Sequence, residues 1–452
     1  MKPLLLVTIG LGSVVFGFAL AAQVTTSSPV TSEDQRTAWY RNAKFGMFIH
    51  WGPYSLASVE ASWPIMRPSK QFPITELEYR ALPAKFNPAH FDPYAWIALA
   101  KSAGQRYMVF TTKHHDGFCM FDSAYTDYKI TKTPYGKDIV AQLAEACHRE
   151  HMPLGFYYSP PDMNHPAFRD TSQPASANWN GEPTREQWPL YLQYMELQLR
   201  ELLTRYGDVA LIWFDGLNNQ RKYDGYRMQQ VIHSLQPQTL INNRIGIPGD
   251  FETPEQFLPA AIPVKGATLD FNHRATGTKP GYVPPPNDFR LWETCMTINN
   301  TWAYNKNDRD FKSTKDLVRT LVEVASRGGN FLLNVGPEPD GTIQPEFQER
   351  LRTIGKWLDV NGEAIYGTTY GPLQTLSFGR TTAKGTNIYL HVFEWPSSGE
   401  ISVPGLSGKV QSVMLLAGNK KIRFRQNDRD LVLNVTGIQA DPYVTVFKFS
   451  ME

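Results

Sequence analysis

Cysteine is scarce in this sequence of 452 residues, which contains only Cys119, Cys147 and Cys295 and no CxxC pair. At most one disulfide could form, so no disulfide framework can hold the fold together. The core must instead be stabilised by burial of apolar side chains, and a chain of this length can form two or three domains.

Excess charge is also absent, since 45 Lys and Arg face 43 Asp and Glu. We therefore expect no nucleic-acid partner, because no field would attract one. There is no GxSxG turn for a serine nucleophile, and no GxGxxG or GxxxxGK[ST] loop for a nucleotide. Aromatic residues, in contrast, make up 13% of the chain. Most must serve core packing, but the surplus suits stacking against neutral, hydroxyl-rich ligands such as sugars.

Long apolar segments are missing after residue 22, where no stretch reaches the ~18 residues of a membrane-spanning helix. Before that point, Lys2 precedes an apolar run that ends in Ala21-Ala22. This layout predicts a signal peptide at 1–22, with an uncleaved anchor as the alternative. Residues 23–38 are rich in Ser and Thr and are expected to form a flexible tether. We expect a secreted or periplasmic protein with no membrane contact after signal cleavage.

From Trp39 onward, short apolar runs alternate with segments of helical periodicity. Such alternation in units of ~30 to 50 residues indicates βαβ crossovers and a parallel sheet. Seven to eight strands predict an α/β fold, a (β/α)8-like TIM barrel over 39–366 with one or two helices missing. A doubly wound sheet is the alternative, but polar and aromatic residues follow most strands, which favours the barrel. The expected strands are 44–52, 106–113, 153–159, 209–214, 239–243, 291–297 and 330–335, and the expected helices are 93–103, 139–150, 187–204, 224–235, 314–325 and 344–360.

Two regions interrupt this rhythm. Residues 245–290 are rich in Pro and Gly and long for a loop, which usually marks a lid or binding loop. From Gly371 to the C-terminus, strand patterns follow one another without helices, which predicts an antiparallel β-sandwich domain at 371–452. Trp395 is the only tryptophan there, so we expect that this domain does not bind glycans by itself.

Asp215 is the first candidate for chemistry. The apolar run from Val209 to Phe214 reads as a buried strand that follows a helix, so Asp215 lies at the carboxyl end of a strand. Catalytic side chains of α/β folds project from that end. The Asp-Gly pair is also common in turns, so a plain capping role stays open.

Other strand ends supply aromatic rings, hydrogen-bonding groups and carboxylates, which together would form a sugar-binding site at the barrel mouth. These residues are His50, Trp51, His114, His115, Asp116, Tyr157, Tyr158, Trp213, Asn242, Asn243, Arg244, Trp292, Glu293 and Trp302, with Trp63 in the region after the first strand.

A metal site at His114, His115 and Asp116 is disfavoured, because neighbouring side chains on a strand point to opposite faces. Paired carboxylates suit the hydrolysis of an acetal, which needs an acid and a second carboxylate. Asp215 suits a nucleophile, and the acid would be a Glu beside apolar groups that keep it protonated. Glu252, Glu255 and Glu293 all qualify, and these residues alone do not decide among them.

The motifs KFGMFIHWG, TTKHHDGF, YYSPPD, GDVALIWFDG, NNR, GDFETPEQ, LWETCMT and GGNFLLNVGPEPDG together resemble the retaining α-L-fucosidases of glycoside hydrolase family 29. They occur in the same order over roughly 39–366. The resemblance implies an N-terminal barrel, a C-terminal β-sandwich and exo-acting hydrolysis of terminal α-L-fucosyl linkages. It implies retention through a covalent fucosyl-enzyme intermediate, a fucosylated glycan as substrate and neither a metal nor an organic cofactor.

The resemblance also implies roles for single residues. Asp215 in WFDG would be the nucleophile, and Glu255 or Glu293 the acid/base, with Glu255 preferred. The histidines of FIHWG and KHHDG and the arginine of NNR would bind the sugar, and Trp302 would pack on the fucose methyl group. The remaining substrate-binding candidates are Trp63, Tyr157 and Trp213. Many family members carry Glu where this chain has Ser62, which puts one hydrogen bond to fucose in question.

Two rival functions are compatible with the same residues. A barrel glycosidase for another sugar would share the chemistry, and a non-catalytic fucose-binding protein would share the site. An Asp at the strand end with candidate Glu partners argues against a pure binder. The Pro-rich segment 257–290 is expected to influence which linkage is cut, and the oligomeric state is not indicated.

Overall fold

The computed structural model describes residues 33–66, 72–168, 185–216, 223–266, 268–269, 275–276 and 279–452. The predicted signal peptide (1–22) lies outside them, as do residues 23–32 of the predicted tether. Helix α1 (Glu33–Ala43) begins within that tether. Its start is fixed by tertiary contacts that local composition does not reveal: Tyr40 is fully buried, and Arg36 donates to Asp250 over 2.9 Å.

Seven parallel strands form the central sheet, in the spatial order β5-β4-β3-β2-β1-β9-β8. Every strand is buried on both faces, as expected for a parallel sheet covered by helices. The strands are β1 (Phe45–Ile49), β2 (Met108–Lys113), β3 (Leu154–Tyr158), β4 (Leu211–Phe214), β5 (Leu240–Ile241), β8 (Glu293–Thr297) and β9 (Asn330–Val335).

The two edge strands are joined through the segment 251–255. Phe251 forms a parallel bridge with Asn242 after β5, while Glu252 and Glu255 form parallel bridges with Trp292 and Cys295 at β8. This segment therefore takes the place of the eighth strand of the barrel, and we call it the closing segment. Part of the predicted loop 245–290 thus belongs to the barrel wall. The short pair β6 (Thr268–Leu269) and β7 (Ala275–Thr276) follows it.

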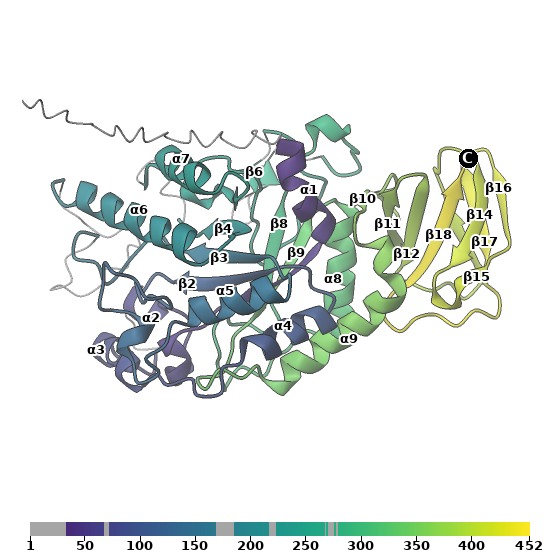
Figure 1. The fold of residues 1–452 in the computed structure, drawn as a ribbon. Coiled ribbons are helices and arrows are strands. Elements are labelled where there is room, and N and C mark those ends of the chain that lie inside the picture. The colour runs from purple at the N-terminus through teal and green to yellow at the C-terminus, as the bar shows by residue number, and fades with distance from the viewer. Residues whose placement is uncertain are drawn as a thin grey trace, which may run out of the picture.

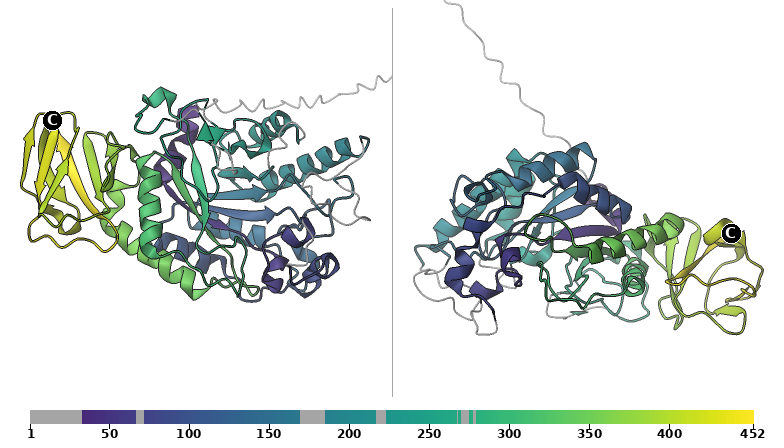
Figure 2. Two further views of the ribbon diagram at one scale, coloured as in Figure 1. Left: turned by 180° about the vertical axis from the view of Figure 1, so that it is seen from behind. Right: turned by 90° about the horizontal axis from the view of Figure 1, so that it is seen from below.

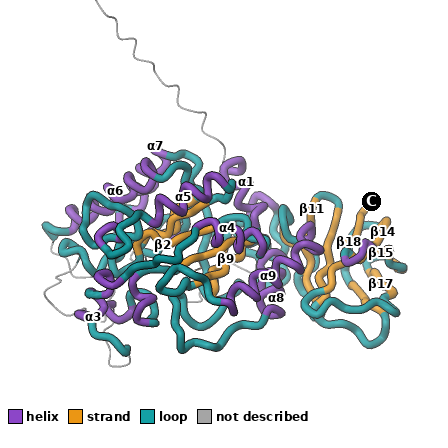
Figure 3. The backbone as a smooth tube through the Cα atoms, turned by 60° about the horizontal axis from the view of Figure 1, so that its bottom comes forward, coloured by secondary structure: helices purple, strands orange, loops and turns teal. Residues whose placement is uncertain are grey.

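Helices surround the strands, as Figure 3 shows. Side-chain caps fix where several begin: Asp92, Asp138 and Ser313 each accept a backbone N–H of the first turn. None of the helices in the described ranges is long and apolar enough to span a membrane. The helices are α2 (Trp63–Met66), α3 (Glu76–Arg80), α4 (Pro93–Ser102), α5 (Ile139–Arg149), α6 (Trp188–Arg205), α7 (Gly225–Leu235), α8 (Thr314–Ser326) and α9 (Pro345–Asn361).

Aromatic side chains fill the inside of the barrel. Phe48, Tyr107, Tyr157 and Trp213 belong to one buried cluster. Trp213 lies 5.1 Å from Phe48 and 5.7 Å from Tyr157, between ring centroids. The interior is therefore a packed core that supports the residues at the carboxyl ends of the strands.

The C-terminal region forms a β-sandwich beside α8 and α9 (Figures 1 and 2). One sheet has the order β10-β11-β12-β18-β14-β15 and the other β13-β17-β16. The chain is thus a (β/α)8-like barrel followed by an antiparallel β-sandwich, as expected. Its strands are β10 (Thr369–Tyr370), β11 (Gly379–Lys384), β12 (Asn387–Val392), β13 (Glu400–Val403), β14 (Val410–Leu415), β15 (Lys420–Lys421), β16 (Phe424–Asn427), β17 (Asp430–Asn434) and β18 (Thr445–Met451).

Candidate active site

Asp215 directly follows β4 and is only 9% exposed. Tyr157 donates its hydroxyl to Oδ2 over 2.9 Å, and Nη1 of Arg244 donates to Oδ1 over 3.0 Å. His115 Nε2 lies 3.3 Å from Oδ2. The next residue, Gly216, allows the chain to pass Arg244, because a Cβ there would lie 2.2 Å from the arginine carbonyl oxygen. Gly216 is therefore required because the ends of β4 and β5 approach each other closely at this point.

These contacts hold Asp215 as a carboxylate. Burial by itself would raise its pKa, but the hydrogen bond from His115 and the charge of Arg244 outweigh burial and leave the pKa well below its ordinary value. An ionised carboxylate fixed on a rigid strand end has the properties of a nucleophile.

Arg244 also contacts Glu255. The same Nη1 atom donates to Glu255 Oε2 over 2.8 Å, while Nε and Nη2 donate to the side chain and carbonyl of Thr253. Because one nitrogen binds both carboxylates, the two contacting oxygens are at most about 6 Å apart, so both carboxylates can face one glycosidic bond. The Glu255 side chain is 25% exposed and therefore accessible from solvent.

Three histidines lie beside this pair, each with Nδ1 held by a polar side chain. His50 contacts Asn334 Oδ1 at 2.7 Å, His114 contacts Ser62 Oγ at 2.6 Å, and His115 contacts Ser159 Oγ. Burial lowers the pKa of His50 to about 4 and depresses that of His114 as well. Both are therefore neutral imidazoles at neutral pH, suited to hydrogen bonding with hydroxyl groups.

The tautomers follow from the neighbours. Asn334 donates its Nδ2 to the carbonyl of Trp302 over 2.7 Å, so its oxygen must face His50. His50 Nδ1 consequently donates, and Nε2 is the acceptor for a ligand hydroxyl. Ser159 donates to the Pro161 carbonyl over 2.6 Å and therefore accepts from His115 Nδ1.

The predicted aromatic residues occupy different depths. The Tyr157 ring is stacked with His114 at 5.3 Å between centroids, and its hydroxyl reaches Asp215. Trp302 is partly buried, 5.0 Å from His50. Trp213 lies deeper, covered by the guanidinium of Arg244 at 4.7 Å. Trp63, at the start of α2, is partly buried next to Ser62.

Glu293 and Glu252 lie apart from the Asp215–Glu255 pair. Glu293 is the first residue of β8 and fully buried, and its carboxylate accepts from Trp213 Nε1 over 2.9 Å and from the Tyr107 hydroxyl. Burial raises its pKa to about 7 despite these donors. Glu252 contacts Arg290 at 3.1 Å and Asn243 at 2.6 Å. Residues other than Arg244 therefore hold these two carboxylates in place.

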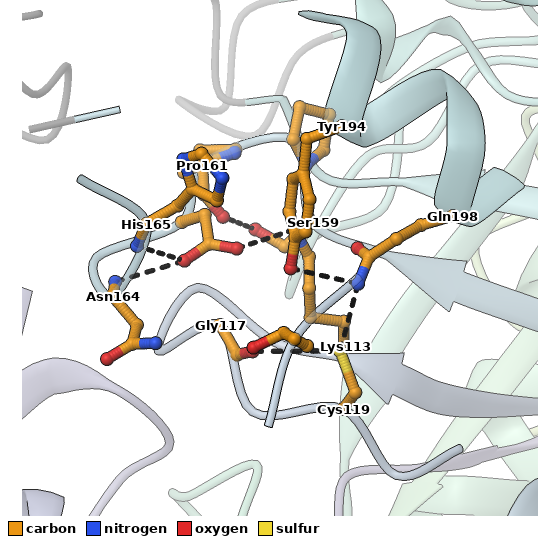
Figure 4. A network of polar contacts seen from close by, with 12 residues as sticks. Lys113, Gly117, Cys119, Ser159, Pro161, Asn164, His165, Tyr194 and Gln198 are labelled. Atoms are coloured by element: carbon orange, nitrogen blue, oxygen red, sulfur yellow. Dashed lines mark hydrogen bonds and ion pairs between the residues drawn. The ribbon is translucent and has the colours of Figure 1, made fainter. Parts of the chain in front are cut away.

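A buried ion pair between Lys113 and Asp162 lies close in sequence and space to His115. Lys113 Nζ lies 3.0 Å from Asp162 Oδ2, and both side chains are at most 1% exposed. Asp162 also accepts the backbone N–H groups of Asn164 and His165 (Figure 4). Met163 in turn donates its backbone N–H to the carbonyl of His115 over 2.8 Å. The loop after β3 is thereby fastened to the end of β2.

Sequence patterns missed these supporting residues. Ser62, Ser159 and Asn334 orient the histidines, and Thr253 fixes Arg244. Asn334 offered one signal, as a polar residue inside the apolar strand NFLLNV. Among the described residues, no group of three or more His, Cys, Asp or Glu could hold a metal ion. The three cysteines are buried free thiols.

Two carboxylates and a set of neutral hydrogen-bonding groups at the carboxyl end of a barrel are typical of barrel glycosidases. A family model described as Alpha-L-fucosidase matches residues 18–363. Plasma alpha-L-fucosidase of Homo sapiens is 30% identical over 389 residues, covering 81% of this chain and 78% of that protein. The alpha-L-fucosidase of Dictyostelium discoideum is 27% identical over 451 residues, covering 91% and 92%.

Solved structures of alpha-L-fucosidases are also similar to this chain. Alpha-L-fucosidase isoenzyme 1 from Paenibacillus thiaminolyticus superposes with a TM-score of 0.81 at 35% identity, covering 93% of this chain and all of that one. A trapped covalent intermediate of a family 29 alpha-L-fucosidase from Bacteroides thetaiotaomicron has a TM-score of 0.78 at 27% identity, covering 94% and 98%. The chain belongs to the α-L-fucosidase family of glycoside hydrolases, and its activity is that of an α-L-fucosidase.

Proposed function

We propose that this protein is an exo-acting α-L-fucosidase that removes terminal fucosyl residues with retention, through a covalent fucosyl intermediate on Asp215. The observation that carries the proposal is the contact of one Arg244 nitrogen with both Asp215 and Glu255. This arrangement supports a nucleophile and an acid/base that act on the same glycosidic bond. The trapped intermediate of the Bacteroides relative supports the same chemistry.

In the first step, a carboxylate oxygen of Asp215 attacks the anomeric carbon while Glu255 gives its proton to the leaving oxygen. Arg244 contacts both carboxylates and so keeps the ionised Asp215 beside Glu255. Ester formation then neutralises Asp215. The ion pair with Arg244 leaves Glu255 as the base that deprotonates the attacking water in the second step.

Recognition of the sugar falls to the neighbouring side chains. His50, His114 and His115 would bind fucose hydroxyls, and the indole of Trp302 would contact the methyl group. An apolar contact at this carbon favours a 6-deoxy sugar. Trp63 is a further candidate contact, whereas Trp213 acts from below by supporting Arg244.

We also propose that the chain is secreted through its N-terminal signal sequence and acts on fucosylated glycans. The human relative that it resembles is a plasma protein by name. A signal peptide would account for the apolar residues before Gln23.

Azide rescue of 4-nitrophenyl α-L-fucoside hydrolysis tests the roles. Removing the acid/base lets azide attack the β-linked intermediate, so Glu255→Ala should yield α-fucosyl azide. Removing the nucleophile lets azide displace the leaving group directly, so Asp215→Gly should yield the β-azide. Glu293→Gln serves as the matched carboxylate control and should show no rescue.

Rescue of a Glu293 variant instead of Glu255→Ala would assign the acid/base to Glu293. Wild-type-like hydrolysis by Asp215→Gly would refute the covalent mechanism. If the wild type cleaved other aryl glycosides faster than the fucoside, the substrate assignment would be wrong while the mechanism could stand.

A further inference from the structure

The backbone of Trp302 is held from both sides. Its N–H donates to Glu60 Oε2 over 2.8 Å, and its carbonyl accepts from Asn334 Nδ2 over 2.7 Å. The next residue, Ala303, donates its N–H to Glu60 Oε1 over 3.1 Å. Since Asn334 also orients His50, the Trp302 carbonyl is linked to His50 through one side chain.

The Trp302 loop also packs closely on the end of β9. A Cβ at Gly336 would lie 2.6 Å from the Ala303 carbonyl carbon, so only glycine admits this approach. The indole lies 5.0 Å from His50 and 6.0 Å from Phe48, between ring centroids. The contacts of Glu60, Asn334 and Gly336 with this loop therefore fix the position of the Trp302 indole over the barrel core.

Glu60 fits its position as a carboxylate. Ala61 donates a third backbone N–H to Oε1 over 2.9 Å, so both oxygens act as acceptors. Burial raises the pKa of Glu60 to about 7, and the nearby charge of Glu255 adds to this, whereas the three N–H donors oppose it. A glutamine would place an amide NH2 group against one of these N–H donors and could not satisfy all three.

The segment from Glu60 to Ser62 also positions His114, a second candidate for binding the sugar. Two residues after Glu60, the fully buried Ser62 holds His114 Nδ1 at 2.6 Å and accepts the N–H of Asp116 over 2.9 Å. Ser62 has a φ of 62°, a conformation that non-glycine residues rarely adopt. Tertiary contacts therefore define this turn, which places one carboxylate toward Trp302 and one hydroxyl toward His114.

We propose that Glu60 is a positioning residue for sugar selectivity: by holding the backbone of Trp302, it fixes the indole where it contacts the C6 methyl group of fucose. The inference rests on the proposed function of the site. L-Galactose differs from L-fucose only by a hydroxyl on C6, and an indole pressed against that hydroxyl would deprive it of water without offering an acceptor. A displaced indole would discriminate less between the two sugars.

The test compares kcat/KM for 4-nitrophenyl α-L-fucoside and 4-nitrophenyl α-L-galactoside. Glu60→Gln and Trp302→Ala should each lower the fucoside-to-galactoside ratio about tenfold. The double variant should lower it no further, because both changes remove one interaction. Glu78→Gln, in the exposed cap of α3, is the control and should keep the wild-type ratio.

A folded Glu60→Gln variant with the wild-type ratio would overturn the proposal. So would a loss that is equal for both substrates, since that indicates a general structural defect. If Glu60→Gln does not fold, Glu60→Asp keeps the charge but shortens the reach, and its ratio should also fall. A wild type that cleaves neither substrate would refute the proposed function itself, independently of Glu60.

Discussion

At the scale of single residues, one guanidinium sets the distance between the two candidate catalytic carboxylates. Arg244 can do so because Thr253 binds its Nε and Nη2 atoms and Trp213 supports its flat face. Nη1 donates to both Asp215 and Glu255. A planar cation with fixed donors holds such an arrangement, which a flexible ammonium group could not.

Arg244→Lys should therefore lower kcat/KM for the aryl fucoside by at least about 100-fold, although the positive charge is kept. The reason is that a lysine cannot contact Thr253 and both carboxylates together. Arg149→Lys, at an exposed ion pair with Glu145, is the matched control and should be neutral. Nearly wild-type kinetics of Arg244→Lys would show that charge alone suffices.

Glu293 should make stability depend on pH. Its pKa is about 7 in the folded protein and 4.5 in the unfolded reference, so the folded state binds the extra proton between these values. The contribution is complete below pH 4.5 and is lost as pH rises through 7. Relative to Glu293→Gln, the free energy of unfolding of the wild type should fall by up to about 3 kcal/mol over this window.

Urea unfolding of both proteins at pH 5, 6, 7 and 8 measures this difference. Glutamine suits the site because its oxygen can face Trp213 while its amide donates to the Tyr107 hydroxyl. Parallel stability curves for the two proteins would mean that Glu293 is already ionised in the folded state.

At the scale of elements, periodic helices and buried strands were predictable, whereas the closing segment was not. The start of α5 was recognisable because Asp138 precedes an amphipathic stretch, and β4 because six apolar residues lie between breakers. The segment 251–255 contains Pro254 and no apolar run, and isolated bridges to both sheet edges define it. Such pairing between distant segments leaves no local sequence signal.

The same limit applies to the site. Residues at strand ends, such as Asp215 and His115, could be named because a parallel barrel gathers those ends. The choice between Glu255 and Glu293 depends on their depth in the barrel, which only tertiary packing fixes. The contact of Glu60 with Trp302 could not be predicted from the sequence, because Glu60 accepts a backbone N–H from a residue 242 positions away.

The loop after β3 provides a test at this scale. Asp162→Asn should destabilise the protein by about 3–5 kcal/mol, because it leaves Lys113 buried without its counter-charge. Asp127→Asn breaks an exposed pair with Lys132 and should cost less than about 1 kcal/mol. Denaturant unfolding compares them, and equal losses would show that the buried pair has no special importance.

At the scale of the whole molecule, buried apolar side chains join the barrel to the β-sandwich, which also has an apolar core of its own. One buried cluster contains Trp357 and Leu358 of α9 together with Tyr389, Val444 and Val446 from the C-terminal strands. Trp357 also donates its Nε1–H to the Val444 carbonyl over 3.0 Å. We propose that 371–452 is a separate domain in architecture that nevertheless stabilises the catalytic domain at 39–366.

Calorimetry of the full-length protein should consequently show a single cooperative transition, since unfolding of the sandwich would expose the apolar face of α9. Deletion of residues 371–452 should abolish soluble, active protein for the same reason. A milder change, Trp357→Ala, should cost about 3–5 kcal/mol and lower the melting temperature without altering KM of the remaining folded enzyme. Two well-separated transitions, or a deletion variant that hydrolyses the aryl fucoside at the wild-type rate, would show that the barrel is stable alone and that the sandwich has another purpose.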